Sequence, residues 1–442
     1  MTTQQNIGTH TFFTSFGKIL ALKENGVIKA KSIRYARSER YKMPIPLEAA
    51  ESYEILDKTP VCPQHISPLL ERLIGKTDID KFLPDESPQF LTITRPEKFN
   101  ENEKLPVVVW IHGGSYEIGC GDLPTSDPTL WVKEQNIIFV SISYRLGLFG
   151  FLGGDENRPA NLGLFDIIES LKWIKKNIQD FGGDPENITL FGQSSGGDAI
   201  AHLMISEGVD NLFQRAIIHS APLGFRIKRS KMSFDFFQKT ESLKNEIDAL
   251  KMTESYAEFL PSFMKYGLKT SMPFCTQYGY PPLCKEEESL LKWKENAKKY
   301  DVLIGLNNDE TAFYVKTAEE GLYTYLHEKI LNKIVRKTTE SIYEKPANIF
   351  AQNYKSGDGN IYQFKIKSTL KNNYIGASHC VDLPLIFENE AAWKNSGLLK
   401  DVPWTHIQEN GKKLRSLWAE FARTGKISDH SERPEILNLR KV

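Results

Sequence analysis

The chain has 442 residues, of which 40% are hydrophobic and 25% charged, as is typical of a globular protein with a large core. Fifty-six basic side chains balance fifty-six acidic ones, so net charge favours neither nucleic acid nor an anionic membrane surface as a partner. No apolar run approaches the roughly 18 residues of a membrane span, and the N-terminus lacks the basic and apolar blocks of a signal peptide.

The first predicted element is a β-hairpin. Residues 16–35 alternate apolar and polar side chains around Glu24-Asn25-Gly26, and Asn-Gly between two such runs is typical of a tight hairpin turn. Four short runs that follow are apolar on successive residues, which predicts strands buried on both faces at 107–111, 137–142, 188–191 and 216–219.

Helices are predicted between these strands. Apolar residues recur at helical spacing in 164–180, and Gly182-Gly183 ends the pattern. Strands that alternate with helices predict an α/β fold with a mostly parallel sheet.

The later chain is predicted to add helical insertions to this sheet. Residues 221–299 are rich in lysine and mostly helical in pattern, which indicates a cap, and 313–370 are a second insertion after a strand at 302–306. No Gly/Ser linker divides the chain, so we expect a single domain, 1–442. The sheet core is expected to comprise residues 16–220, 300–312 and 371–430.

A candidate nucleophile follows the predicted strand 188–191. Gly192-Gln193-Ser194-Ser195-Gly196 fits the Gly-x-Ser-x-Gly pattern, and a helix is predicted at 195–206. The pattern alone also occurs in loops of small residues, but strand, turn and helix together indicate a nucleophile elbow. Ser194 is the central serine and the expected nucleophile, and Ser195 is expected to direct its backbone N–H at the developing oxyanion.

A second glycine-rich turn, 110–119, follows the predicted strand 107–111. Consecutive glycines there can present backbone N–H groups to an anion, although a merely flexible turn has the same composition. Two such turns in the chain order of an α/β hydrolase favour the functional interpretation.

With these motifs the chain resembles the type-B carboxylesterase family, which comprises the cholinesterase-like α/β hydrolases. Within this family it is most similar to the bacterial para-nitrobenzyl-esterase-type members. The resemblance rests on seven segments: 106–114, 136–152, 161–197, 213–222, 305–314, 376–387 and 417–427. It implies an α/β-hydrolase fold with a reduced helical cap, and a serine carboxylesterase that hydrolyses uncharged carboxylic esters through an acyl-serine intermediate.

The family motifs also imply roles for individual residues. The implied set is Ser194, Glu310 and His379 as catalytic triad, the N–H groups of Gly114, Ser115 and Ser195 as oxyanion hole, Gly113 as a loop-shaping residue and Ser220 as a support for the acid. A serine hydroxyl is a poor nucleophile at its free pKa, so a base must take its proton. A histidine does this near neutral pH, and a carboxylate orients its ring.

Other histidines are expected to be structural. His112 is expected to pack against or orient the glycine loop, and His202 and His219 lie in a predicted helix and strand.

Several positions depart from the family pattern. Gln193 stands where the family motif has glutamate, which removes a negative charge beside the nucleophile and argues against a preference for a cationic alcohol. Ser115 replaces a glycine, so a positive φ there would cost strain. Asp198 adds a carboxylate to the start of the predicted helix, where its charge suits the helix N-terminus; the sequence does not show whether it reaches the pocket.

The five cysteines indicate a reducing compartment, and we expect a cytoplasmic protein. Their number is odd, no CxxC pair occurs, and the family partner of Cys62 is absent from 86–89. Cys120 and Cys380 flank the predicted site, where they either pack as small apolar side chains or make the site sensitive to thiol reagents.

The expected partner is a small-molecule ester, and no metal-binding or organic-cofactor motif is recognised. Thioesterase or amidase activity of the same triad is the alternative within the enzymes. A non-catalytic, cholinesterase-like binding protein is the alternative outside them. The physiological ester and the oligomeric state are not indicated by the sequence.

Overall fold

The computed structural model describes residues 8–49, 56, 58–66, 68–100, 102–316, 325–367 and 375–442. Its centre is an eleven-stranded sheet with the order β1-β2-β3-β8-β10-β9-β11-β12-β13-β14-β15. The six strands from β10 to β14 run parallel, and the remaining pairs are antiparallel. The strands are β1 Gly8–Thr14, β2 Gly17–Glu24, β3 Val27–Arg34, β8 Phe90–Pro96, β9 Leu105–Ile111, β10 Ile138–Ile142, β11 Gly183–Gln193, β12 Arg215–His219, β13 Asp301–Asn307, β14 Ile361–Ile366 and β15 Leu437–Lys441.

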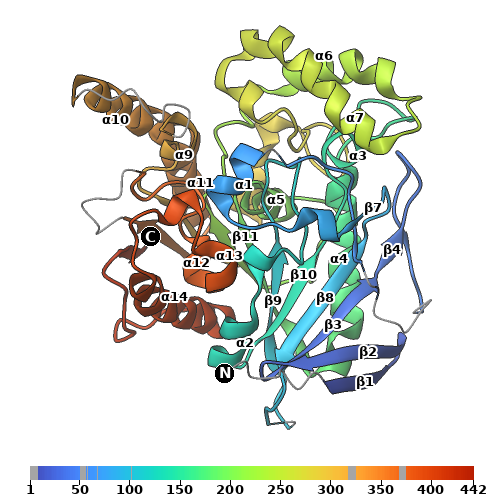
Figure 1. Cartoon of the computed structure of the whole chain (residues 1–442), viewed down its shortest axis with the longest axis vertical. Helices are drawn as coiled ribbons and strands as arrows, with labels where there is room; N and C mark the ends of the chain where they lie inside the picture. The colour runs from blue at the N-terminus through green and yellow to red at the C-terminus, as the bar shows by residue number, and fades with distance from the viewer. Residues whose placement is uncertain are drawn as a thin grey trace.

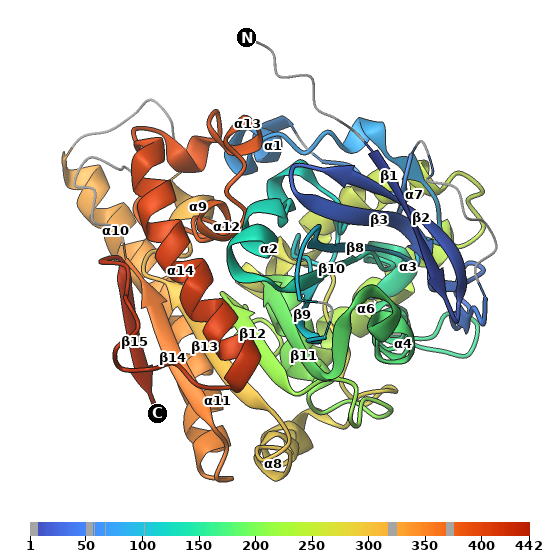
Figure 2. The same ribbon diagram turned by 90° about the horizontal axis from the view of Figure 1, so that it is seen from below.

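Helices cover both faces of this sheet (Figures 1 and 2). They are α1 Pro68–Ile74, α2 Thr129–Gln135, α3 Gly147–Gly150, α4 Leu162–Asn177, α5 Ser195–Leu203, α6 Ser230–Thr240, α7 Ala249–Ser255, α8 Ser289–Glu295, α9 Ala312–Val315, α10 Tyr325–Thr339, α11 Lys345–Lys355, α12 Leu383–Ile386, α13 Glu390–Trp393 and α14 Trp404–Thr424. Two small sheets pair β4 Ala36–Arg37 with β5 Ile45–Pro46 and β6 Pro60–Val61 with β7 Leu83–Pro84.

The predicted hairpin is confirmed at β2 and β3. Glu24 pairs with Val27, which leaves Asn25 and Gly26 as a two-residue loop. Both loop residues have positive φ, +52° and +78°, as the tight turn with this sequence requires.

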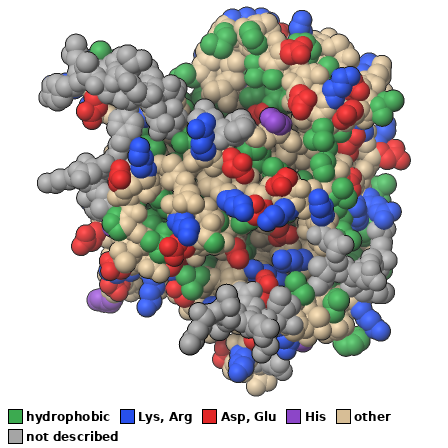
Figure 3. Space-filling view, viewed as in Figure 1, with side chains coloured by type: hydrophobic (Ala, Val, Ile, Leu, Met, Phe, Trp, Pro, Cys, Tyr) green, Lys and Arg blue, Asp and Glu red, His purple; other side chains and the backbone are tan. Residues whose placement is uncertain are grey.

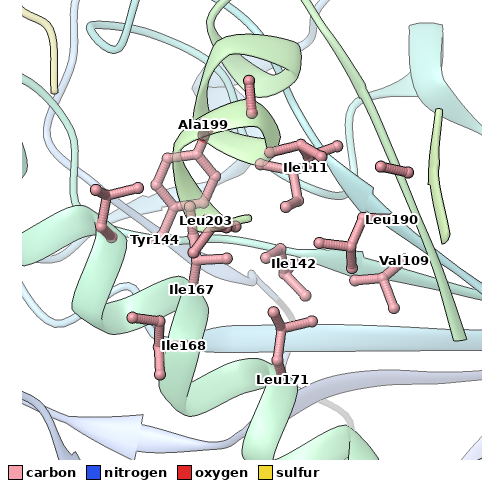
Figure 4. Close-up of a cluster of buried hydrophobic side chains, with 14 of the residues drawn as sticks. Val109, Ile111, Ile142, Tyr144, Ile167, Ile168, Leu171, Leu190, Ala199 and Leu203 are labelled. Atoms are coloured by element: carbon pink, nitrogen blue, oxygen red, sulfur yellow. The ribbon is translucent and has the colours of Figure 1, made fainter. Parts of the chain in front are cut away.

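The core lies on both sides of the parallel strands. Along β9, Val107, Val109 and Ile111 belong to one apolar cluster while Val108 and Trp110 belong to the other, so successive side chains face opposite layers. Figure 4 shows side chains of α4 and α5 meeting those of β9, β10 and β11 in the first cluster. Helix α14 packs on the opposite face, which explains why these strands are apolar on successive residues.

The predicted bounds of the sheet core are wrong for three strands: β1, β14 and β15 all lie outside 16–220, 300–312 and 371–430. Strand β14 lies inside 313–370, which was expected to be a helical insertion, and 371–430 supplies helices α12, α13 and α14 with no strand among its described residues. β14 has half-buried Gln363 and Lys365 between buried neighbours, so it lacks the continuous apolar run that marked the other parallel strands. Residues 317–324 and 368–374 of these two segments lie outside the described residues. The count of one domain stays a prediction.

The predicted cap segment, 221–299, is helical. It contains α6, α7 and α8, and α6 and α7 stand above the sheet at the top of Figure 1. Helix α5 and the loops after the parallel strands lie beneath them, which places the carboxyl ends of β9 and β11 under this cover.

Candidate active site

The Gly-x-Ser-x-Gly turn joins β11 to α5, as predicted. Ser194 lies between them with φ +57° and ψ −127°, a conformation that L-residues rarely adopt outside strained functional turns. Its N–H donates to the carbonyl of His219 on the neighbouring strand, at 2.9 Å, which anchors the turn to the sheet. A side chain at Gly196 would place its Cβ 2.0 Å from the carbonyl oxygen of Ile111, so the helix meets β9 at a distance only glycine permits.

His379 and Glu310 form a buried pair. His379 Nδ1 lies 2.6 Å from Glu310 Oε2, and the backbone N–H of Asn307 donates to Glu310 Oε1 at 2.6 Å. Glu310 is fully buried and His379 is only 2% exposed. Both carboxylate oxygens are therefore engaged, and the acid can hold only one orientation against the imidazole.

A second buried histidine, His219, lies behind this pair, and it was expected to be structural only. Trp418 Nε1 donates to His219 Nε2 at 2.7 Å. Because an indole N–H can only donate, Nε2 is the acceptor and the proton of His219 sits on Nδ1, which is 2.6 Å from Asp382 Oδ2. Burial alone would raise the pKa of Asp382, but the hydrogen bond from His219 and its other partners outweigh burial and hold that pKa below its usual value.

Asn307 joins the two pairs. Its side-chain amide donates to Asp382 Oδ1 at 2.9 Å and to the carbonyl of Ser378 at 3.0 Å, while its backbone holds Glu310. Asn307 and Asp382 were not among the predicted site residues, although both lie in the segments that carry the family resemblance. The expected supporter, Ser220, is buried with φ +50° and donates its N–H to the carbonyl of Gly305.

Gln193 contacts the histidine directly. Its Nε2 lies 3.3 Å from His379 Nε2 and 3.5 Å from the sulfur of Cys380. Since Nδ1 of His379 faces the carboxylate, Nε2 is the acceptor and the amide of Gln193 donates to it. Gln193 therefore binds the same nitrogen that a serine proton would need.

The glycine loop after β9 approaches the elbow from the other side. A Cβ at Gly113 would lie 2.7 Å from the carbonyl of Gln193, and Gly114 has φ +110° with its carbonyl accepting from Glu117 and Ile118. Ser115 has φ +58°, so the side chain at the family's glycine position does sit in the strained region that the sequence analysis considered. Ser195 begins α5, so its N–H is among the first four that lack an acceptor within the helix.

Tyr116 fastens this loop to α5 at two points. Its N–H donates to Ser195 Oγ at 3.1 Å, and its hydroxyl donates to Asp198 Oδ2 at 2.7 Å. Asp198 is buried, and its Oδ2 also lies 3.3 Å from His202 Nδ1. Asp198 thus holds the loop through Tyr116. It does not line the cavity into which the loop and the elbow open.

These groups share one cavity of about 560 Å³, lined by Gly114, Ser115, Gln193, Ser194 and His379 among others. Its remaining wall is largely apolar and aromatic, including Trp110, Phe149, Tyr256, Phe313 and Trp393. His112 lies in the wall, and burial lowers its pKa to about 4, so it is neutral at pH 7. An uncharged acyl or alkyl group fits such a lining.

All five cysteines are free. Burial raises the pKa of the Cys380 thiol well above its ordinary value and raises that of Cys120 too, so neither is a thiolate at neutral pH.

Comparison with known proteins agrees with this geometry. The model of the carboxylesterase family matches residues 13–325. A probable N-octanoylanthranilate hydrolase from Rhodococcus erythropolis is 30% identical over 412 residues, 90% of this chain and 89% of that protein. The para-nitrobenzyl esterase of Bacillus subtilis is 29% identical over 95% of this chain and 91% of its own.

A solved structure of a thermophilic PNB esterase superimposes with a TM-score of 0.74 and 26% sequence identity, covering 98% of this chain and 93% of that one. A second PNB esterase structure gives a TM-score of 0.76 at 23% identity, which supports the fold. The chain therefore belongs to the carboxylesterase family, and it is a carboxylic ester hydrolase with the α/β-hydrolase fold.

Proposed function

We propose that Ser194, His379 and Glu310 are the nucleophile, base and acid of a serine esterase. The observation that carries this proposal is that the strained Ser194 turn and the buried His379–Glu310 pair open into one cavity beside a glycine loop. His379 Nε2 takes the proton of Ser194 Oγ as this oxygen attacks the ester carbonyl. The histidine then gives the proton to the leaving alkoxide, which departs as the alcohol. In the second half of the reaction, water takes the place of the serine: His379 removes its proton, and the water attacks the acyl-serine and releases the acid.

Glu310 fixes the tautomer that this reaction needs. With Nδ1–H held against the carboxylate, Nε2 keeps its lone pair for the serine proton, and the imidazolium that forms is stabilised in a buried site. The Gln193 amide has to yield Nε2 before the proton can move, because both compete for one lone pair.

The developing oxyanion is stabilised by backbone donors, proposed as the N–H groups of Gly114, Ser115 and Ser195. The loss of one such donor costs about 3 to 4 kcal/mol of barrier in comparable sites. The two contacts of Tyr116 with α5 keep the loop and the elbow at a fixed separation.

Amide hydrolysis by the same groups is the second candidate. It is favoured by the similarity to a hydrolase named for an N-acyl substrate, N-octanoylanthranilate. An amide differs from an ester in its leaving nitrogen, which must be protonated as it departs, and His379 is the group placed to do so.

The test is hydrolysis of a panel of chromogenic esters and anilides by the wild type, Ser194→Ala and Ser195→Ala. We expect Ser194→Ala to abolish turnover of every substrate. Ser195→Ala keeps its backbone N–H and should retain far more activity than Ser194→Ala, although it removes the acceptor of the Tyr116 N–H. Full activity in Ser194→Ala would overturn the mechanism, and a wild type active only on anilides would favour the second candidate.

A cytoplasmic location is also proposed. It is supported by five free cysteines, which suit a reducing compartment. Within the described residues, no helix has the length and apolarity needed to cross a membrane. The partner proposed is a small-molecule ester.

A further inference from the structure

The cap segment contains a second cavity, next to the first turn of α6. Its volume is about 310 Å³, and it shares no lining residue with the cavity around Ser194. Ten described residues line it; three of them are the cations Arg226, Arg229 and Lys231, and none is an aspartate or a glutamate. Like charges that share one cavity repel one another, so the local charge favours an anion there.

Arg229 is buried with part of its guanidinium unpaired. The side chain is 3% exposed, and Nη2 donates to the carbonyls of Met272 and Pro273, which fixes its position. Nε and Nη1 have no hydrogen-bond partner among the described residues. A buried donor without a partner is costly, and a buried charge without one is more so. Arg229 therefore has two donors to offer a ligand that accepts hydrogen bonds.

Arg226 shows the same arrangement in the same cavity. It is 6% exposed, its guanidinium carbon lies 4.5 Å from the centre of the Trp293 ring, and Nη1 donates to the hydroxyl of Tyr278 at 2.8 Å. Its Nε has no hydrogen-bond partner among the described residues. The ring and the hydroxyl hold the guanidinium in place, but neither is a carboxylate that would neutralise its charge.

The two guanidinium charges are only partly compensated. No carboxylate of the described residues forms an ion pair with either arginine. Burial lowers the pKa of Arg229, and the attraction of the buried Asp198 does not restore it. Asp198 carries one negative charge against two positive ones, and its Oδ2 is engaged by Tyr116 and His202. Cys275 adds no charge, since burial raises the pKa of its thiol to about 11.

The N-terminus of α6 adds donors of a different kind. Helix N-termini carry a partial positive charge, so acidic or capping side chains usually occupy them. Helix α6 instead has Arg229 as its N-cap without a side-chain hydrogen bond, Lys231 in its first turn and no acid there. The first N–H groups of a helix also lack acceptors within it. Basic side chains at such a terminus are stabilised when an anion binds between them.

This excess of positive charge is local. Over the face shown in Figure 3, Lys and Arg side chains are interspersed with Asp and Glu, and the whole chain has no net formal charge. The molecule as a whole therefore does not attract anions, and an anion that binds beside α6 is selected by the cavity itself.

We propose that this cavity binds the phosphate group of a small phosphorylated molecule. A phosphate monoester carries about two negative charges at neutral pH and three acceptor oxygens. It therefore suits two guanidinium groups, Lys231 and a helix N-terminus better than a singly charged carboxylate does. The volume of about 310 Å³ exceeds that of a phosphate alone and leaves room for a small organic part.

The first test is calorimetric titration of the full chain with inorganic phosphate, glycerol 3-phosphate and acetate at constant ionic strength. We expect both phosphates to bind, and acetate to bind about tenfold more weakly or worse. Arg229→Gln should weaken the binding of glycerol 3-phosphate about tenfold, which is about 1.4 kcal/mol. Lys239→Gln is the matched control: it removes the same charge from the exposed last turn of α6 and should change this affinity less than about twofold.

A second variant keeps the test decisive if Arg229→Gln fails to fold, since that variant also loses the bonds to Met272 and Pro273. Lys231 is exposed, so Lys231→Gln leaves the core intact and should weaken binding about threefold. Thermal unfolding gives an independent readout. Glycerol 3-phosphate should raise the Tm of the wild type more than chloride of equal ionic strength does, and the difference should shrink in both variants.

A lipid headgroup presents the same phosphate chemistry, and vesicles distinguish the two sources. Sedimentation with phosphatidic acid vesicles but not with phosphatidylcholine vesicles, lost in Arg229→Gln, would identify a lipid as the source of the phosphate. Binding of glycerol 3-phosphate without such sedimentation would identify a soluble molecule.

Three results would overturn the inference. The first is a wild type that binds neither phosphate nor phosphatidic acid vesicles, and the second is an equal affinity in the wild type, Arg229→Gln and Lys231→Gln. The third is acetate binding as tight as that of the phosphates. Ester hydrolysis at Ser194 plays no part in these measurements, so a failure of the proposed function would leave their outcome unchanged.

Discussion

The two-point attachment of Tyr116 to α5 makes a quantitative prediction for Tyr116→Phe. The variant removes only the hydroxyl that donates to Asp198 Oδ2 at 2.7 Å. Asp198 is 1% exposed, its Oδ1 has no hydrogen-bond partner among the described residues, and His202 Nδ1 is 3.3 Å from Oδ2. The buried carboxylate would therefore lose its shortest hydrogen bond, and bonds to charged groups contribute about 1.5 to 3 kcal/mol. We expect the free energy of unfolding to fall by about 2 kcal/mol.

The functional effect of Tyr116→Phe should be smaller than the loss of an oxyanion donor. The proposed oxyanion donors, the N–H groups of Gly114 and Ser115, remain, but the loop that carries them is less firmly held. We therefore expect kcat to fall about tenfold, against a hundredfold or more for the loss of a donor. Urea unfolding and kcat for a chromogenic ester measure the two effects.

A double-mutant cycle isolates the contact. Tyr116→Phe and Asp198→Ala each remove this hydrogen bond, so the double variant should be destabilised by about 2 kcal/mol less than the sum of the two single variants, and that difference is the coupling energy. A stability change below about 0.5 kcal/mol in Tyr116→Phe, with unchanged kcat, would refute the reasoning that this hydrogen bond positions the loop.

Three further predictions concern stability and thiol chemistry. Burial lowers the pKa of His112 to about 4, so between that pH and about 6.5 the unfolded chain binds a proton at His112 and the folded chain does not. The free energy of unfolding should therefore fall by about 3 kcal/mol as pH drops from about 6.5 to about 4. A His112→Asn variant should lose that part of the pH dependence in denaturant titrations at several pH values. Arg145→Ala removes the ion-pair partner of buried Asp166, which lies 2.7 Å away, and should lower the free energy of unfolding by about 3 to 5 kcal/mol in the same assay. A decrease below about 1 kcal/mol would contradict this prediction. Iodoacetamide at neutral pH should label half-buried Cys284 first, without loss of esterase activity, and rapid inactivation would instead favour a thiol-sensitive site.

The strands and turns with strong local signals were predictable from the sequence. The Asn25-Gly26 hairpin and the four apolar runs follow from turn chemistry and from burial on both faces, and each appears in the structure. The elbow was predictable for the same reason, since glycine at 196 is imposed by the approach of α5 to β9 within the strand–turn–helix unit itself.

What could not be predicted depends on contacts between distant segments. β14 is recognisable as a strand only through its pairing with β13, because its own polar residues hide the pattern. Asn307 and Asp382 lie three residues from Glu310 and His379 in the sequence, but their roles depend on being brought together behind Glu310, which the sequence alone does not show. Nothing in the sequence distinguishes Glu117 from an ordinary surface glutamate, and only the fold shows that it lines the cavity.

The hydrogen-bonded chain from Trp418 through His219, Asp382 and Asn307 to Glu310 has a consequence for biosynthesis. A ribosome synthesises the elbow early and the proposed base, His379, and α14 late, so a nascent chain contains Ser194 long before its proposed activating residue. Until α14 arrives, one face of β9 and β11 lacks its cover, and these apolar strands are open to misassociation. Catalytic competence and safety from aggregation are thus reached at the same late moment of synthesis.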